Sequence, residues 1–156
     1  MNKKNTPNSH SQVNYNQITD SIFIGTNFCC MAHFDEDLLD KNITIDISLE
    51  EERIDTPFGV EAYLWLPTED NYAPNQYQFE TGVEAIKNAI DNNKKVYVHC
   101  KNGHGRSPTL VIAYFMKHED MNLKEAKDLI KSKRPEIHLH DPQIEGLKKY
   151  KNTLNN

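Results

Sequence analysis

The strongest constraint on the fold is the direct succession of a strand-like run, a glycine-containing loop and a helix-like run over residues 96–116. Val96 to Val98 alternate β-branched and aromatic side chains, as a short buried strand does. Cys100 and a loop with two glycines follow, and the next run, Leu110 to Met116, is apolar on all sides, as in a central buried helix. This succession predicts an α/β fold with the loop at the C-terminal end of a strand, where open α/β sheets bind their ligands.

Hydrophobic periodicity predicts the other elements. We expect strands over residues 22–24, 43–47 and 60–66, with a helix over 28–39 between the first two. Further helices are expected from Pro74 to Asn92, from Asn122, which forms a capping-box pattern with Glu125, and from Asp141 with its following proline. The predicted fold class is therefore α/β. A short, mainly parallel sheet is flanked by helices in three layers, and the C-terminal half is helical.

Length and composition indicate one globular domain. The chain has 156 residues, 37% of them hydrophobic, and a formal net charge of −5. We assign the domain to residues 15–156 and expect the polar residues 1–14 to form a disordered tail. No apolar run is as long as a membrane span and the start lacks a secretory signal, so we expect no stable membrane association. The acidic balance argues against nucleic acid as a partner.

The three cysteines, Cys29, Cys30 and Cys100, suit a chain kept reduced in the cytoplasm. Adjacent Cys29 and Cys30 do not make a metal site by themselves, and His138 with His140 is the nearest approach to paired ligand spacing. We therefore predict no metal and no cofactor, and interpret Cys29 and Cys30 as buried thiols. The alternative, in which either cysteine protects Cys100 through a disulfide, stays open because the sequence gives no distance.

The loop from Cys100 to Arg106 has the residues needed to hold a phosphate dianion. Its glycines let successive backbone amides converge on an anion. Ser107 with Pro108 is typical of an N-cap and a first helical residue, so the positive end of the helix points into the loop and favours the thiolate of Cys100. The planar fork of Arg106 can bind two phosphoryl oxygens at once. We predict that Cys100 attacks phosphorus while the amides and Arg106 stabilise the charge.

The loop also fills every position of a signature that reads His-Cys, two residues, Gly, two residues, Arg, Ser or Thr, with His99, Cys100, Gly103, Arg106 and Ser107. It thus resembles the cysteine-dependent protein tyrosine phosphatases, and the order of elements from Ile22 to Tyr150 is similar to their compact dual-specificity branch. The resemblance implies that His99 braces the loop and that Ser107 hydrogen-bonds the departing thiolate. It places the substrate phosphate on Lys101, Asn102, Gly103, His104, Gly105 and Arg106.

The resemblance further implies an aspartic acid on a separate loop, which protonates the leaving oxygen and then activates water. Asp70 stands thirty residues before Cys100, a separation similar to that of the family, and Glu69 is the rival candidate. Gln143 is a candidate for positioning the water, with an exposed helix surface as the alternative. The acidic block over residues 48–53 follows a strand and is interpreted as a solvated turn, with a position at the border of the site as the alternative that the resemblance offers.

These observations predict a phosphomonoester hydrolase. The leading hypothesis is a dual-specificity protein phosphatase whose partner is a phosphorylated protein, cleaved at phosphotyrosine and at phosphoserine or phosphothreonine through a phosphocysteine intermediate. One alternative is a phosphatase for a lipid or inositol phosphate, because Lys101 and residues 134–139 look like those of mitochondrial-type phosphatidylglycerophosphate phosphatases. Another is a non-catalytic phosphopeptide-binding module, against which the presence of Cys100, Arg106 and Asp70 argues.

Overall fold

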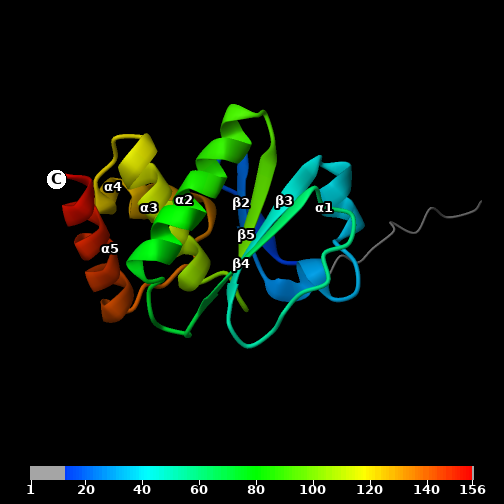
Figure 1. Ribbon diagram of the computed structural model, residues 1–156, viewed down its shortest axis with the longest axis horizontal. Coiled ribbons are helices and arrows are strands. Elements are labelled where there is room, and N and C mark those ends of the chain that lie inside the picture. The colour runs from blue at the N-terminus through cyan, green and yellow to red at the C-terminus, as the bar shows by residue number, and fades with distance from the viewer. Residues whose placement is uncertain (1–12, 156) are drawn as a thin grey trace, which may run out of the picture.

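A five-stranded mixed sheet forms the centre of the computed structural model, which describes residues 13–155 (Figure 1). The strand order is β1-β2-β5-β3-β4, in which β1 runs antiparallel to β2 and the other neighbours are parallel. The strands are β1 (Tyr15–Gln17), β2 (Ile22–Gly25), β3 (Ile43–Glu50), β4 (Ala62–Thr68) and β5 (Lys95–His99). The prediction of a short, mainly parallel sheet is confirmed.

Helices cover both faces of the sheet and make the three predicted layers (Figure 1). On one side lie the four long helices, α2 (Gln76–Asp91), α3 (Arg106–His118), α4 (Leu123–Lys133) and α5 (Asp141–Leu154). On the other lie a 3-10 turn, η1 (Asn27–Cys30), and the short helix α1 (Glu36–Asp40). Within the described residues, no helix is long and apolar enough to cross a membrane.

Strand β5 shows how the alternation of side chains builds two cores. Val96 and Val98 pack into the large cluster beneath the long helices, whereas Tyr97 between them packs into a second cluster with Phe34 and Leu38. Period-two alternation sends neighbouring residues to opposite faces of a sheet, so this strand is buried on both sides. Helix α3 is buried from its first residue through Met116, as the apolar run predicted.

Several helix starts agree with the sequence patterns. Helix α4 begins after Asn122, whose side chain accepts from the Glu125 N–H in the predicted capping box, and α5 begins at Asp141. Helix α2 begins at Gln76, two residues after the expected Pro74, because Asn75 is the N-cap. The strand expected over residues 60–66 lies over 62–68, and β1 was not predicted.

The helix expected over residues 28–39 is wrong. The 3-10 turn ends at Cys30, and Asp35 starts the separate five-residue α1 by accepting from the N–H groups of Asp37 and Leu38. A short polar side chain that bonds the backbone in this way competes with a continuous helix.

The N-terminal boundary also differs from the expected one. Of the predicted disordered tail, residues 1–12 lie outside the described residues. Val13 is buried, and the Asn14 carbonyl accepts from the Thr26 N–H at 3.0 Å. These two residues therefore pack with the domain that we had begun at residue 15.

Candidate active site

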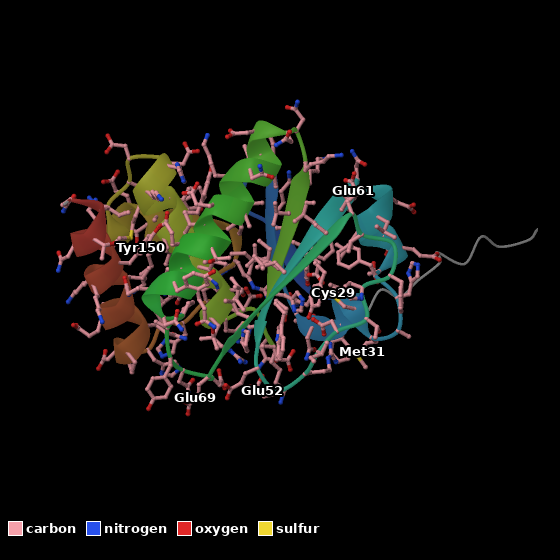
Figure 2. The ribbon with its side chains drawn as sticks, in the orientation of Figure 1. Cys29, Met31, Glu52, Glu61, Glu69 and Tyr150 are labelled. Atoms are coloured by element: carbon pink, nitrogen blue, oxygen red, sulfur yellow. A yellow bond between two sulfur atoms is a disulfide. The ribbon has the colours of Figure 1, made fainter. Side chains whose placement is uncertain are left out.

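Three parallel strands end at the same edge of the sheet and bring the predicted site residues together. Strand β5 leads into Cys100, the loop after β3 carries Glu52, and the loop after β4 carries Glu69 and Asp70. Glu52 and Glu69 both lie at this edge of the molecule (Figure 2). Helix α3 starts here as well, so its N-terminal N–H groups face the loop that begins at Cys100.

The loop from Cys100 to Gly105 is shaped by contacts that leave no room for side chains at its glycines. Gly103 has φ +69°, and a Cβ there would lie 2.5 Å from the carbonyl oxygen of Gly25. A Cβ on Gly105 would lie 2.9 Å from Nε2 of Gln143. The left-handed backbone at Gly103 directs its N–H toward the Cys100 sulfur, at 3.3 Å. A side chain at Gly103 would therefore collide with the backbone of Gly25, whereas one at Gly105 would have to displace the amide of Gln143.

The sulfur of Cys100 is buried, 3% of the residue being exposed, and is surrounded by donors. Ser107 Oγ lies 3.4 Å from it, in addition to the Gly103 N–H. Burial raises the pKa of Cys100, but the hydroxyl and N–H of Ser107, the charge of Arg106 and the N–H of Gly103 outweigh burial and lower it below the ordinary thiol value. The surroundings favour a thiolate.

The prediction that Ser107 caps the helix is wrong. Helix α3 begins at Arg106 with Gly105 as its N-cap, and the Gly105 carbonyl already accepts from the Thr109 N–H at 3.0 Å. Ser107 and Pro108 therefore lie inside the first turn. The hydroxyl that we expected at the cap is free to face the Cys100 sulfur instead.

Arg106 is almost fully buried, with 2% of its side chain exposed, and is held by two neighbouring loops. Its Nη1 donates to both carboxylate oxygens of Glu52 at 3.0 Å and to the Thr68 carbonyl at 2.9 Å. Its Nε has no hydrogen-bond partner and lies 3.6 Å from Oδ1 of Asp70. One edge of the guanidinium is thus fixed while Nε remains available. Glu52 therefore borders the site as the alternative expected, although 43% of its side chain is still exposed to solvent.

Asp70 lies in the pocket above Cys100 and is well exposed, with 68% of its side chain accessible. The pocket has a volume of about 200 Å³. Its polar lining consists of Asp70, Asn71, Cys100, Lys101, Asn102, His104, Gly105, Arg106, His138, His140 and Gln143. Among the described residues this lining includes Asp70 but not Glu69, so the geometry favours Asp70 as the acid. A larger apolar pocket, of about 490 Å³, lies between β3, β4 and α2 and does not include Cys100.

Gln143 is buried at the start of α5 and joins this helix to the site. Its Oε1 accepts from the His140 N–H at 2.8 Å, and its Nε2 donates to the Tyr72 carbonyl at 3.3 Å. The alternative that placed Gln143 on an exposed helix surface is therefore wrong. His138 and His140 are exposed and line the same pocket.

Arg134 is a functional residue that the sequence reasoning missed. It is 1% exposed, and it donates to the carbonyls of Asn102 and Gly103 at 2.9 Å each. These bonds hold in place the loop from Cys100 to Arg106, which we call the phosphate loop. It also donates to the side chains of Asn14 and Asn16 at 2.9 and 2.7 Å. In the sequence, residues 134–139 stood out only by their likeness to lipid phosphatases, and nothing in that likeness indicated that Arg134 holds the loop.

His99 is completely buried and lies between two carboxylates. Its Nε2 is 3.1 Å from Oδ1 of Asp46 and 3.2 Å from Oδ2 of Asp55, and its Nδ1 is 3.3 Å from the Cys100 carbonyl. Burial opposes the charge on the imidazole, but the two carboxylates outweigh burial and raise the pKa of His99 to about 10. Contacts through both ring nitrogens agree with the expected bracing of the loop.

Cys29 and Cys30 are buried beside His99. Their sulfurs are joined to each other in a disulfide, and Cys100 is the free cysteine. The interpretation of Cys29 and Cys30 as thiols is therefore wrong for this structure, although their burial is confirmed. In the described part of the chain, neither is bonded to Cys100.

The family model of the dual specificity phosphatase catalytic domain matches residues 22–153. The chain belongs to this family. A mouse protein assigned as a dual specificity phosphatase has a similar structure, with a TM-score of 0.81 and 26% identity over 90% of this chain and 88% of that one. The fold and the cysteine loop therefore agree with the resemblance drawn from the signature residues.

Two curated relatives differ in the activity that their names give. MAP kinase phosphatase with leucine-rich repeats protein 3 of Dictyostelium discoideum is 36% identical over 101 residues, which cover 63% of this chain and 12% of the relative. Phosphatidylglycerophosphate phosphatase PTPMT2 of Arabidopsis thaliana is 40% identical over 83 residues, which cover 52% of this chain and 36% of the relative. In both cases the chain spans well under half of the relative.

Proposed function

We propose that the protein is a cysteine-dependent phosphomonoester hydrolase that acts on phosphorylated proteins, at phosphotyrosine and at phosphoserine or phosphothreonine. The observation that carries this proposal is the setting of the Cys100 sulfur, with the Gly103 N–H at 3.3 Å and Ser107 Oγ at 3.4 Å. These donors stabilise a thiolate at the base of a loop of amides next to Arg106. The lowered pKa of Cys100 favours a thiolate, which is easily oxidised, and this supports a reducing compartment such as the cytoplasm as the location.

The first step forms a phosphocysteine. Cys100 Sγ attacks phosphorus, the bond from phosphorus to the substrate oxygen breaks, and Asp70 gives its proton to that oxygen. The loop amides from Lys101 to Gly105 and the guanidinium of Arg106 bind the non-bridging oxygens, whose charge they stabilise in the transition state. The free Nε of Arg106 supplies a donor that is not already engaged by Glu52 or Thr68.

The second step restores the enzyme. Asp70, now a carboxylate, takes a proton from water, the water oxygen attacks phosphorus, and the sulfur leaves as a thiolate. Ser107 Oγ stabilises that thiolate through the contact described above. Gln143, whose amide lines the pocket, helps to position the water. No step requires a metal or an organic cofactor.

A phosphatase for a lipid or inositol phosphate is the second candidate. It is favoured by Lys101 and by His104, His138 and His140, which surround the pocket with groups able to bind additional anionic oxygens. The similarity to the relative named as a phosphatidylglycerophosphate phosphatase supports the same candidate. The two candidates share the chemistry at Cys100 and differ only in what enters the pocket.

Phosphate release from a phosphotyrosine peptide, a phosphothreonine peptide and phosphatidylglycerophosphate vesicles tests the proposal. We expect turnover of the peptides, no turnover by Cys100→Ser, and a loss of about 10²-fold to 10⁴-fold in kcat for Asp70→Asn. Glu69→Gln, which removes the neighbouring carboxylate, is the matched control and should keep the activity of the unmutated protein.

Three results would contradict parts of this proposal. Faster hydrolysis of the vesicles than of either peptide would assign the site to a lipid. Tight peptide binding without phosphate release would indicate a binding module. Equal activity of Cys100→Ser and the unmutated protein would remove Cys100 as the nucleophile.

A further inference from the structure

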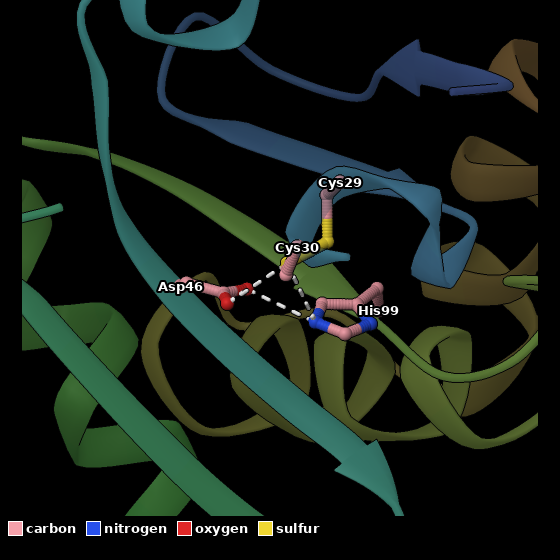
Figure 3. A group of neighbouring side chains, drawn as sticks. All are labelled: Cys29, Cys30, Asp46 and His99. Carbon is pink, nitrogen blue, oxygen red and sulfur yellow. Dashed lines mark hydrogen bonds and ion pairs between the residues drawn. A yellow bond between two sulfur atoms is a disulfide. The ribbon is translucent and has the colours of Figure 1, made fainter. Parts of the chain in front are cut away.

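A second cluster of reactive side chains lies beneath the phosphate loop and plays no part in the proposed reaction. It consists of Cys29 and Cys30 from η1, Asp46 from β3 and His99 from the end of β5 (Figure 3). All four residues are buried, and one ligand atom from each lies within 4.8 Å of the others. Residues far apart in the sequence thus bring two sulfurs, a carboxylate and an imidazole to one point.

Three of these residues, Cys30, Asp46 and His99, lie at separations close to those of ligands around one zinc ion, with Cys30 and His99 next to different oxygens of Asp46. Cys30 Sγ lies 3.2 Å from Oδ2 of Asp46 and 3.7 Å from Nε2 of His99, and this Nε2 lies 3.1 Å from Oδ1 of Asp46. Bond lengths of about 2.3 Å to sulfur and about 2.0 Å to nitrogen or oxygen give tetrahedral ligand separations of about 3.5 Å and about 3.3 Å. The observed separations differ from these by a few tenths of an ångström.

The surrounding contacts are those of a ligand set. The other ring nitrogen of His99, Nδ1, lies 3.3 Å from the Cys100 carbonyl, and histidines that bind metals usually donate their second N–H to such a group. The buried oxygens Oδ1 of Asp46 and Oδ2 of Asp55 lie 3.1 Å and 3.2 Å from the same Nε2 of His99, and the other oxygen of Asp55 accepts from Arg53. One proton on Nε2 is therefore shared between two carboxylates, whereas a divalent cation bound by Asp46 and His99 would compensate the charge of Asp46 directly.

The state of the cysteines decides whether the cluster can bind a cation. As part of a disulfide, Cys30 Sγ has no proton to donate and faces a carboxylate oxygen at 3.2 Å. An external dithiol or phosphine that breaks the bond supplies two electrons and two protons, which gives two thiols. Their protons leave when a metal binds, and the two thiolates become ligands.

We propose that the reduced protein binds one zinc-class divalent cation through Cys29, Cys30, Asp46 and His99. Thiolate and imidazole ligands select zinc over magnesium or calcium, which prefer oxygen. Four buried protein ligands are the number that a closed structural zinc site takes, so the proposed site is structural rather than catalytic. The cation would join η1, β3 and the end of β5, and would hold the residue that directly precedes the phosphate loop.

The test is a titration of the full, reduced chain with cobalt(II), followed by displacement of the cobalt with zinc. Cobalt(II) binds in zinc sites, and its absorption spectrum reports tetrahedral coordination by thiolates. We expect one equivalent bound, with thiolate-to-cobalt charge transfer in the near ultraviolet. Cys30→Ser should weaken binding at least tenfold and reduce that band. Cys100→Ser is the matched control, because it removes the other cysteine and should leave both the stoichiometry and the spectrum unchanged. The disulfide form should bind no cobalt.

Zinc X-ray absorption on the unmutated, reduced protein provides a measurement that does not depend on the folding of any variant. Two sulfurs and two nitrogen or oxygen neighbours are expected in the first coordination shell. A shell without sulfur would overturn the proposal, and so would cobalt binding that survives Cys30→Ser but disappears in Cys100→Ser. Absence of cobalt binding by the reduced chain would overturn it as well.

Discussion

Arg134 offers the sharpest test of how the phosphate loop is held in place. The guanidinium is buried with no carboxylate among its four hydrogen-bond partners, and two of those partners are the carbonyls of Asn102 and Gly103. The substitution Arg134→Met keeps the length and the apolar stem of the side chain and removes all of these bonds. The carbonyls belong to a loop whose path is fixed on both sides, so they have little freedom to turn toward water.

The loss of stability in Arg134→Met comes from the acceptors that no longer receive a hydrogen bond. A buried acceptor left without a donor costs about 1–3 kcal/mol. The Asn14 and Asn16 side chains can reorient, so we count only the two carbonyls and expect a loss of about 2–6 kcal/mol in the free energy of unfolding. Domains are stable by about 5–15 kcal/mol, so over most of this range the variant should still fold. We also expect kcat to fall at least tenfold, because the loop amides lose their fixed arrangement.

Urea unfolding and steady-state hydrolysis of a phosphotyrosine peptide measure the two effects. Lys133→Met is the matched control, since the neighbouring lysine is exposed and its loss should change stability by less than about 0.5 kcal/mol. If Arg134→Met is as stable as Lys133→Met, the hydrogen bonds to the loop contribute nothing and the reasoning fails. If stability falls but kcat does not, Arg134 supports the fold without organising the loop.

Three further substitutions test other parts of the structure. Gly103→Ala puts a side chain at φ +69°, 2.5 Å from the Gly25 carbonyl, so we expect a loss of at least about 2 kcal/mol in urea unfolding together with most of the activity; an active, stable variant would contradict the loop geometry. Glu52→Gln removes a negative charge 3.0 Å from Arg106 and should make inorganic phosphate a several-fold stronger inhibitor, whereas weaker inhibition would show that Glu52 chiefly positions the arginine. Asn122→Ala removes the cap of α4 and should cost about 1 kcal/mol in thermal or urea unfolding, and an unchanged midpoint would refute a role for the cap.

Features that depend on neighbouring residues were predicted well from the sequence. The alternation in Val96 to Val98 indicated a short buried strand, and the apolar run after the loop indicated the central helix. The two glycines between Cys100 and Arg106 predicted a tight loop, which the structure contains. Each of these rests on a local rule, either the period of a strand or helix or the need for glycine at a tight turn.

Local rules also produced errors where two of them competed. Ser107 with Pro108 has the composition of a helix start, yet the helix begins earlier because the Gly105 carbonyl already accepts from Thr109. The expected helix over 28–39 failed because Asp35 starts a new, shorter helix. The deciding acceptor is a backbone carbonyl in the first case and the Asp35 side chain in the second, and composition alone indicated neither.

The sequence by itself determined that this chain folds as an α/β phosphatase domain around a loop from Cys100 to Arg106. Only the tertiary structure decided what surrounds that loop: Glu52 on Arg106, Arg134 beneath the carbonyls, and Asp46 with the two N-terminal cysteines beside His99. The physical reason is that strands and helices repeat the same backbone dihedral angles from one residue to the next. Their side-chain directions therefore show as a periodic pattern in a short stretch of sequence. Contacts between distant segments depend on the path of the whole chain, which no short pattern contains.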